Sequence, residues 1–220
     1  MTIWAAIPVK PISEGKSRLA AALSLPARER LNNNLFRKTL NAVAAVFAAE
    51  NVIVVSRDAS LREQATARGM RAIAEQGDDL NDALYEAASL VQNDALLAIS
   101  IDLPEITPED VRAMLLECEG RAPAVAIAPD RAQRGTNALF TSPAACIPFR
   151  FGEHSFSAHL EAAQRAGIVP AIITRPGLAF DLDLPEDLLR CPPDLSSSPM
   201  VKLLSSSELV KLRHQKDFWR

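Results

Sequence analysis

Residues 95–104 read Ala-Leu-Leu-Ala-Ile-Ser-Ile-Asp-Leu-Pro, an apolar run that ends in an acidic residue. A continuous apolar run of this kind predicts a strand buried on both faces, which is typical of a parallel sheet covered by helices. The next stretch, Thr107-Pro108-Glu109-Asp110, offers a capping Thr, a Pro at the first helical position and acids in the first turn, so it predicts a helix start. A central strand at 95–101 that leads into a helix indicates an α/β protein.

Strands and helices are predicted to alternate on both sides of this central strand. The expected strands are 2–9, 52–55, 70–73, 125–128, 138–140 and 169–173, and the expected helices are 28–47, 58–68, 80–91, 155–166 and one that starts at 185–187. This order predicts a three-layer α/β/α sandwich with a Rossmann-like, mostly parallel sheet. Two strands in close succession between 125 and 140 predict an antiparallel insertion, so the sheet is expected to be mixed. Ligands of such sheets bind beyond the carboxyl ends of the strands.

The length of 220 residues fits one domain with an appendage. We expect the domain at 1–191, followed by a Ser/Pro-rich linker and C-terminal tail at 192–220, where the chain begins Pro-Pro-Asp-Leu-Ser-Ser-Ser-Pro. The last residues are rich in Lys, Arg and His, and this composition is typical of a mobile linker with a surface helix. A contact between two copies in a homodimer is the alternative for the tail.

Charge and cysteine content argue against several classes of protein. The formal net charge is −3, whereas a general nucleic-acid binder usually carries a basic excess. No run approaches the roughly 18 apolar residues that span a bilayer. Lys10 and Lys16 interrupt the N-terminal apolar stretch, so no signal peptide is expected. Three widely separated cysteines without a CxxC pair argue against zinc and fit reduced thiols in a cytoplasmic protein.

A basic segment follows the first expected strand. It runs from Pro8 to Arg18 and includes Lys10 and Lys16, without the spacing of a Walker loop. Lys16 and Arg18 are suited to hold the β- and γ-phosphates of a nucleotide, and Lys10 is placed to reach the α-phosphate or a second substrate. The alternative is an ordinary loop with solvated charges. Asn81, near a helix start, is a candidate for reading a base edge or for capping that helix.

Three aspartates stand where apolar runs end. Asp102 ends the central strand, while Asp181 and Asp183 alternate on an extended piece and are therefore expected to share one face. Carboxylates in such places are costly unless they are paired or bind a metal. Three of them can hold Mg²⁺ together with water and phosphate oxygens. Capping is the alternative for Asp102, and for Asp183 in particular, because a helix start at Pro185 follows it.

Two glycine-containing segments are candidates for an anion site. Gly135-Thr136-Asn137 combines close backbone approach with a hydroxyl that suits a phosphate or a carboxylate. Gly152 and Ser155 precede an expected helix, whose N-terminus attracts anions. A plain turn is the alternative for the first segment, and an N-cap role is the alternative for Ser155. His154 and His159 lack the spacing of a zinc helix and are expected to be core or surface residues.

Together these segments resemble the 2-phospho-L-lactate guanylyltransferase family of coenzyme F420 biosynthesis, which also includes phosphoenolpyruvate and 3-phospho-D-glycerate guanylyltransferases. The resemblance spans residues 5–190 and rests on ordered motifs. They are Ile7-Pro8-Val9-Lys10-Pro11 with Lys16-Ser17-Arg18-Leu19, Asp102-Leu103-Pro104 with Thr107-Pro108, Gly135-Thr136-Asn137-Ala138-Leu139, Phe151-Gly152 with Ser155-Phe156 and His159, and Asp181-Leu182-Asp183 with Pro185 and Asp187-Leu188. The chain departs from the family where Ser100 replaces a frequent Gly or Ala and where Leu184 replaces a frequent Thr.

The resemblance implies a nucleotidyltransferase fold, GTP as donor, Mg²⁺ as cofactor and a phosphorylated three-carbon acid as acceptor, with release of pyrophosphate. The residues that it implies are Lys16, Arg18 and Asp102 for catalysis; Pro8, Lys10, Lys16, Arg18 and Asn81 for the nucleotide; Thr136, Gly152 and Ser155 for the acceptor; and Asp102, Asp181 and Asp183 for the metal. A downstream deazaflavin transferase would accept the product. The alternatives are another acceptor, such as molybdopterin or a sugar phosphate, and a non-catalytic nucleotide-binding module.

Overall fold

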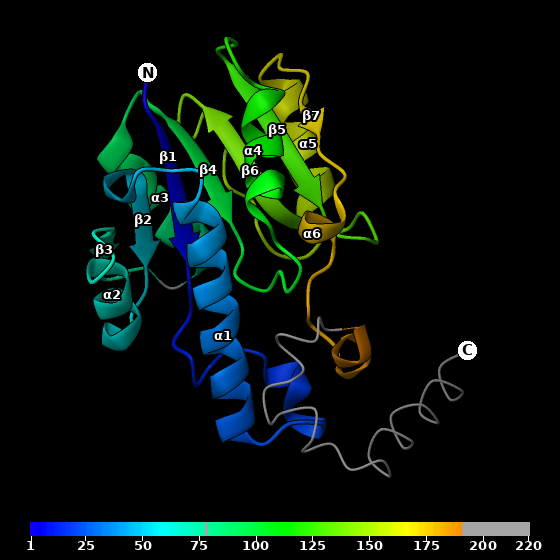
Figure 1. Ribbon diagram of the computed structural model, residues 1–220. Coiled ribbons are helices and arrows are strands. Elements are labelled where there is room, and N and C mark those ends of the chain that lie inside the picture. The colour runs from blue at the N-terminus through cyan, green and yellow to red at the C-terminus, as the bar shows by residue number, and fades with distance from the viewer. Residues whose placement is uncertain (78, 191–220) are drawn as a thin grey trace.

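The computed structural model describes residues 1–77 and 79–190, and the linker and tail expected at 192–220 lie outside the described residues. The strands of this part of the chain are β1 (Ile3–Pro8), β2 (Val52–Val55), β3 (Arg71–Ile73), β4 (Ala95–Ile99), β5 (Ala124–Pro129), β6 (Thr136–Ser142) and β7 (Ala171–Ile172). Its α-helices are α1 (Leu25–Ala44), α2 (Ala59–Thr66), α3 (Leu80–Val91), α4 (Pro108–Leu116), α5 (Ser155–Arg165) and α6 (Pro176–Ala179), and its 3-10 helices are η1 (Ser17–Ala21), η2 (Ala49–Asn51) and η3 (Pro185–Arg190). Figure 1 shows the helices arranged around one sheet.

The strands form one mixed sheet in the order β3-β2-β1-β4-β6-β5-β7. Neighbouring strands are parallel except at β6, which runs antiparallel to both β4 and β5. The predicted antiparallel insertion is therefore confirmed, and β4 is the central strand that the sequence predicts, although it ends at Ile99. Because β6 runs against its neighbours, its first residues lie at the carboxyl end of β4, where Ala138 pairs with Ile99.

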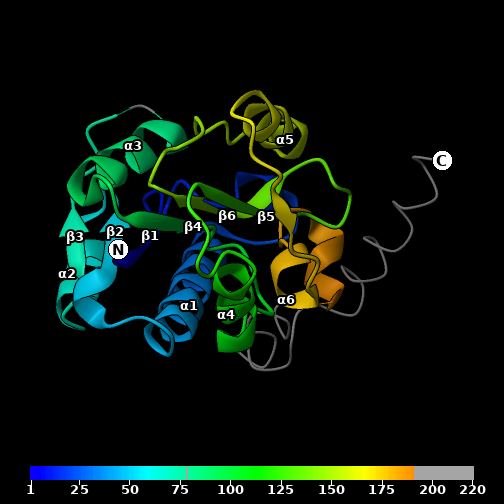
Figure 2. The same cartoon turned by 90° about the horizontal axis from the view of Figure 1, so that it is seen from above.

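Each face of the sheet is covered by its own set of helices. Alternate residues of a strand point to opposite faces. On β1, Ala5 and Ile7 belong to a core that includes buried residues of α1, α2, α4 and α6, whereas Trp4 and Ala6 belong to a second core with α3 and α5. Figure 2 shows α3 and α5 on one side of the sheet and α1 and α4 on the other. The predicted three-layer α/β/α sandwich is confirmed.

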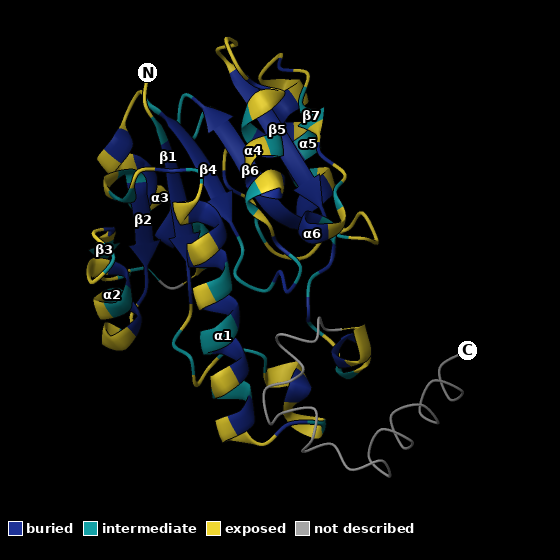
Figure 3. Cartoon of the chain, viewed as in Figure 1, coloured by how far each residue is buried: buried dark blue, intermediate teal, exposed yellow. Residues whose placement is uncertain are grey.

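A third cluster of buried residues, which we call the small core, lies around the first half of α1. Its members are Leu19, Leu23, Ala27, Leu31, Leu35, Leu182 and Leu188. They come from η1, from α1 and from the chain around η3. Figure 3 shows buried residues continuing along α1 to the end that extends past the strands. Burial of these apolar side chains fastens the basic segment and the segment of the last two aspartates to the same helix.

Several elements differ in extent from the sequence prediction. Helix α1 begins earlier than expected, at Leu25, because a Pro in its first turn is compatible with a helix start behind the N-cap residue Ser24. The last expected strand shortens to β7 at the sheet edge, and the helix expected from Pro185 is the 3-10 helix η3. The capping box of Thr107 and Asp110 confirms the predicted start of α4. Among the helices of the described residues, none combines the length and the apolar character that crossing a membrane requires.

Candidate active site

Two adjoining cavities open at the carboxyl edge of the sheet, as expected for an open α/β sheet. The β6 cavity has a volume of about 640 Å³, and besides the common wall it is lined by Arg18, Asp130, Arg134, Gly135, Thr136, Asn137, Glu153, His154, Ser155 and Asp181. The β1 cavity has a volume of about 470 Å³ and is lined by Pro8, Val9, Lys10, Ile12, Gly15, Lys16, Asn32, Asp79, Asn81 and Ile101. The common wall consists of Leu80, Ser100, Asp102, Phe151, Gly152 and Asp183.

The predicted site residues separate between these cavities according to their expected roles. Four of the five expected nucleotide contacts line the β1 cavity, namely Pro8, Lys10, Lys16 and Asn81. Two of the three expected acceptor contacts, Thr136 and Ser155, line the β6 cavity alone, and the third, Gly152, belongs to the common wall. Arg18 and Asp181 also line the β6 cavity, while Asp102 and Asp183 belong to the common wall. Arg18 therefore lines the β6 cavity and not the β1 cavity, where the other four expected nucleotide contacts lie.

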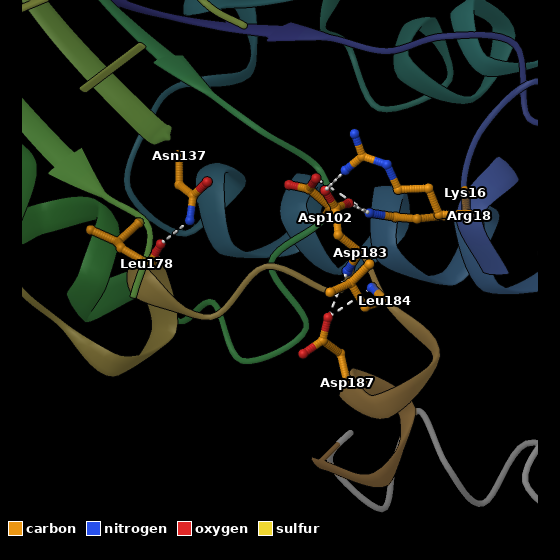
Figure 4. A network of polar contacts seen from close by, with 8 residues as sticks. All are labelled: Lys16, Arg18, Asp102, Asn137, Leu178, Asp183, Leu184 and Asp187. Atoms are coloured by element: carbon orange, nitrogen blue, oxygen red, sulfur yellow. Dashed lines mark hydrogen bonds and ion pairs between the residues drawn. The ribbon is translucent and has the colours of Figure 1, made fainter. Parts of the chain in front are cut away.

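Lys16 joins two of the three predicted metal ligands. Its Nζ lies 3.2 Å from Asp102 Oδ2 and 3.1 Å from Asp183 Oδ1, and Arg18 Nη1 lies 3.2 Å from Asp183 Oδ2 (Figure 4). The Lys16 side chain is only 7% exposed. Burial opposes its charge, but Asp102 and Asp183 outweigh that effect and raise its pKa above the ordinary value. The ammonium is therefore a fixed positive charge beside the common wall, held between two of its aspartates.

The carboxylates around Lys16 carry more negative charge than this lysine neutralises. Burial alone would raise the pKa of Asp102, but Lys16 and a hydrogen bond from Ser100 hold it below the ordinary value. Its Oδ1 is buried without a hydrogen-bond partner. Burial first, and then the charges of Asp102 and Asp183, raise the pKa of Asp181 to about 6. An orphaned carboxylate oxygen beside a carboxyl that resists ionisation fits a site for an additional cation.

A divalent ion fits this donor set, because hard cations prefer carboxylate oxygens. Within the described residues, however, no three side chains of His, Cys, Asp or Glu are already gathered around one metal position. The Lys16 ammonium lies between Asp102 and Asp183 instead. The metal assignment to Asp102, Asp181 and Asp183 stays a prediction.

Asp183 does not cap the helix that follows it. Asp187 Oδ2 accepts hydrogen bonds from the backbone N–H groups of Asp183, at 3.1 Å, and Leu184, at 2.8 Å (Figure 4). Asp187 Oδ1 accepts from Arg131 Nη2 at 3.1 Å. The capping alternative for Asp183 is therefore wrong, and its carboxylate remains directed to Lys16 and Arg18. The sequence signal for this arrangement is an acid four residues beyond Asp183, within the first turn of η3.

The acceptor candidates on the β6 side are linked by hydrogen bonds. Thr136 N–H donates to Ser155 Oγ at 2.9 Å, and Thr136 Oγ1 lies 2.9 Å from His159 Nδ1. The N-cap position of α5 is occupied by His154 in a left-handed conformation, with φ at 58° and without a side-chain cap bond. The N-cap alternative for Ser155 is therefore wrong. His159 is fully buried, so of the two possibilities that the sequence leaves open, core or surface, it is a core histidine.

Two further amide side chains hold the cavity walls in place. Asn81 Nδ2 donates to Phe151 O at 3.2 Å, and Asn81 Oδ1 accepts from Phe151 N–H at 2.7 Å. Asp79 is the N-cap of α3, so the capping alternative for Asn81 is wrong, while its contact with a base stays a prediction. Asn137, which the sequence singled out only as part of a motif, donates to Leu178 O at 2.8 Å (Figure 4).

The fold and the paired cavities define an α/β protein of Rossmann-like architecture with a two-part site at the carboxyl edge of its sheet. A solved structure of a protein from Desulfovibrio desulfuricans G20, assigned as a nucleotide-diphospho-sugar transferase, aligns with a TM-score of 0.72 at 19% identity, covering 98% of this chain and 95% of the other. Glucosyl-3-phosphoglycerate synthase from Mycobacterium tuberculosis, solved with Mn²⁺, UDP-glucose and glycerol 3-phosphate, aligns with a TM-score of 0.61 at 14% identity, covering 92% and 79%. These likenesses establish the fold.

The chain belongs to the family described as "Guanylyl transferase CofC like", whose model matches residues 3–191. Phosphoenolpyruvate guanylyltransferase of Rubrobacter xylanophilus is 42% identical over 86% of this chain and 93% of its own. 2-Phospho-L-lactate guanylyltransferase of Methanocaldococcus infernus is 34% identical, over 83% and 81%. 3-Phospho-D-glycerate guanylyltransferase of Colwellia psychrerythraea is 32% identical, over 90% and 94%. The resemblance recognised from the motifs is confirmed.

Proposed function

We propose that this protein transfers GMP from GTP to a phosphorylated three-carbon acid and releases pyrophosphate, with phosphoenolpyruvate as the acceptor. The observation that carries the proposal is the pair of adjoining cavities with the Asp102–Lys16–Asp183 ion pairs between them. One cavity takes the nucleotide and the other takes the acid. The choice of acid is supported by the 42% identity to a relative named for phosphoenolpyruvate.

The chemistry needs positioning and charge more than a base. A phosphate monoester is already largely dianionic at neutral pH. One of its oxygens attacks the α-phosphorus of GTP, a new P–O bond forms, and the bond to the β-phosphate oxygen breaks as pyrophosphate leaves. The main obstacle is the repulsion between two anions, which fixed cations and hydrogen-bond donors reduce. This accounts for a reaction that uses no nucleophilic Ser-His or Cys-His arrangement.

Residues of this chain supply those charges on both sides of the common wall. Lys10 and Lys16 line the β1 cavity, where they offset the charge of the triphosphate. Arg18 lines the β6 cavity, where it offsets the charge of the acid. Thr136 and Ser155 offer hydroxyls to the same cavity. The phosphate of the acid and the α-phosphate of GTP then meet at the common wall beside Asp102.

We propose Mg²⁺ as the cofactor, held by Asp102, Asp181 and Asp183. The orphaned Oδ1 of Asp102 and the raised pKa of Asp181 support a cation there. When bound, Mg²⁺ supplies positive charge to the oxygens of the reacting phosphates. The pairing of Lys16 with Asp102 and Asp183 holds both carboxylates in place before substrates arrive, and it favours the ionised form of Asp102.

The product is proposed to serve coenzyme F420 biosynthesis, as the family resemblance implies, and to pass to a downstream deazaflavin transferase. The same resemblance supports a cytoplasmic location. A homodimer through the tail stays a proposal.

The test is pyrophosphate release from purified protein with GTP, Mg²⁺ and one acid at a time: phosphoenolpyruvate, 2-phospho-L-lactate or 3-phospho-D-glycerate. The downstream deazaflavin transferase traps the labile product. Asp102→Asn is the matched inactive control, because loss of one carboxylate lowers the rate by on the order of hundreds-fold. Molybdopterin and a sugar phosphate are added as separate acceptors. No pyrophosphate with any of the three acids contradicts the proposal, and release only with molybdopterin or a sugar phosphate replaces the acceptor.

A further inference from the structure

The environment of His159 provides a polar partner for each ring nitrogen, which a core residue that only fills space does not need. It lies in α5 and is fully buried, with the Phe151 ring edge-on at 5.0 Å between centroids. A buried imidazole costs free energy unless its nitrogens are paired. Both are paired here, because Arg150 N–H donates to Nε2 at 3.0 Å and Thr136 Oγ1 lies 2.9 Å from Nδ1.

These two contacts determine which nitrogen carries the proton. A backbone N–H can only donate, so Nε2 accepts from Arg150 and carries no proton. Burial first, and then the Arg150 charge, lower the pKa of His159 to about 4, so the ring is neutral at pH 7. The single ring proton therefore lies on Nδ1, and Nδ1–H donates to Thr136 Oγ1.

This tautomer fixes the role of the Thr136 hydroxyl. A hydroxyl has one proton to donate and two lone pairs that accept. Since Thr136 Oγ1 accepts from His159, its own proton is not used in that bond. Within the described residues, no other hydrogen bond of Thr136 Oγ1 is present, and Thr136 lines the β6 cavity. The opposite tautomer would take the Thr136 proton and leave the cavity with a lone pair.

We propose that His159 is a positioning residue, which presets the Thr136 hydroxyl as a hydrogen-bond donor to the anionic group of the acceptor acid. The proposal rests on the proposed function of the β6 cavity. Phosphate and carboxylate oxygens accept hydrogen bonds, so only a donating hydroxyl is attractive to them. Ser155 Oγ likewise accepts from Thr136 N–H and has its own proton left, so the two hydroxyls form a donor pair.

Two substitutions of His159 separate this role from a purely structural one. In His159→Gln the side-chain oxygen can replace Nε2 as acceptor for Arg150 N–H, but the donor to Thr136 is lost. In His159→Asn the amide N–H replaces Nδ1–H, while the bond to Arg150 is lost. Thr136→Val, which keeps the shape of Thr without its hydroxyl, provides the matched reference.

We expect His159→Gln and Thr136→Val each to raise the acceptor KM about tenfold, the effect of one lost charge-assisted hydrogen bond. The GTP KM stays unchanged, and the double variant is no worse than Thr136→Val alone. His159→Asn keeps the acceptor KM within about twofold, although its melting temperature falls. Equal rises in both KM values for the Gln variant, or additive effects in the double variant, overturn the proposal.

A measurement without turnover reads the tautomer directly. The chain has three histidines, so ¹⁵N-histidine labelling gives three ring systems, and the His159→Gln spectrum assigns the one of interest. We expect a neutral ring with the proton on Nδ1 down to pH 5. A proton on Nε2, or a charged ring at pH 7, overturns the proposal even if His159→Asn does not fold. Absence of wild-type turnover with every acid instead removes the proposed function, and this role with it.

Discussion

At the scale of single residues, the two aspartates of the common wall share a limited positive charge. Lys16 is nearly buried and contacts both Asp102 and Asp183, whereas Asp183 is itself 38% exposed and also contacts Arg18. Removing one partner of a buried ion pair usually costs more than the pair contributes, because the other charge is left unpaired. The stability of the metal-free protein should therefore depend strongly on one lysine.

Lys16→Met is predicted to lower the free energy of unfolding by about 1–3 kcal/mol at pH 7 without divalent cations, a discounted value because Asp183 is partly in water. Lys10→Met, at an exposed lysine of the same segment, is the control, and it should change stability by less than about 0.5 kcal/mol. Urea denaturation followed by circular dichroism measures both. Equal stability of the two variants would show that the buried pairs contribute nothing.

Asp181 gives a pH dependence of opposite sign to that of an ordinary paired carboxylate. Its folded-state pKa is raised from 3.8 to about 6, chiefly by burial and then by the neighbouring acids. The folded state therefore holds this proton more tightly than the unfolded state, and the resulting stability is full below pH 3.8 and lost as pH rises through about 6. Above that pH the ionised carboxylate destabilises the protein.

Asp181→Asn is accordingly predicted to stabilise the metal-free protein at pH 8 by on the order of 1–3 kcal/mol, while it removes activity. The melting-temperature difference between variant and wild type should widen from pH 5 to pH 8. Repeating the measurement with Mg²⁺ should narrow it, since a bound cation offsets the repulsion. A difference that does not change with pH would contradict the role given to this carboxyl group.

At the scale of elements, the segment from Asp181 to Asp187 is held at two points. The small core buries Leu182 within the segment and Leu188 just after it, and Asp187 accepts hydrogen bonds from the N–H groups of Asp183 and Leu184. Arg131, from the loop between β5 and β6, contacts the same carboxylate and stacks on the Phe180 ring at 4.6 Å. The position of Asp183 is therefore set by contacts well outside the cavity.

Asp187→Ala is predicted to destabilise the protein by about 1–3 kcal/mol, because two N–H groups and the guanidinium of Arg131 lose their acceptor. It should also lower kcat, since Asp183 is then less well placed. Glu186→Ala, at the exposed neighbouring position of η3, is the control that should leave both quantities nearly unchanged. Thermal denaturation and pyrophosphate release measure the two effects. Wild-type kcat in Asp187→Ala would show that this contact is irrelevant to the site.

The central strand and the helix start at Thr107 could be predicted from sequence because each depends on adjacent residues alone. The antiparallel direction of β6 could also be predicted, because too few residues separate it from β5 for a helical crossover. The residue that caps η3 could not be predicted, because Asp183 and Asp187 are both suitable capping residues. The choice between these two aspartates is decided by the contacts of Asp183 with Lys16 and Arg18, which lie more than 160 residues away in the sequence.

The histidine contact and the separation of the cavities were also beyond sequence reasoning. The spacing of His159 in the sequence excludes a zinc helix, but it gives no information about Thr136. The packing of α5 on the sheet brings Thr136 beside His159. The role of Arg18 was assigned from its nearness to Lys16 in sequence. Lys16 precedes the 3-10 helix η1 and Arg18 lies within it, and the two side chains line different cavities.

At the scale of the whole molecule, the proposed donor and acceptor sites are formed largely by different parts of the chain. Apart from the residues of the common wall, the β1 cavity is lined by residues numbered up to 101. The β6 cavity is lined by residues numbered from 130 onward, with Arg18 as the exception. Lys10→Ala is therefore predicted to raise the KM for GTP several-fold and to leave the acceptor KM unchanged, with Thr136→Val showing the reverse. Steady-state kinetics with each substrate varied in turn provides the measurement. Similar changes in both KM values for either variant would argue against two separate cavities.

The reversed direction of β6 has a consequence for how such proteins diversify. It places the residues just before Thr136 at the edge of the sheet where β1 and β4 end, so the proposed acceptor pocket forms beside the proposed nucleotide site and shares the common wall with it. Substitutions at Thr136 or Ser155, which line the β6 cavity alone, are therefore expected to change the choice of acid more than the choice of nucleotide. Relatives of this chain are all named guanylyltransferases but are named for three different acids, which matches this expectation.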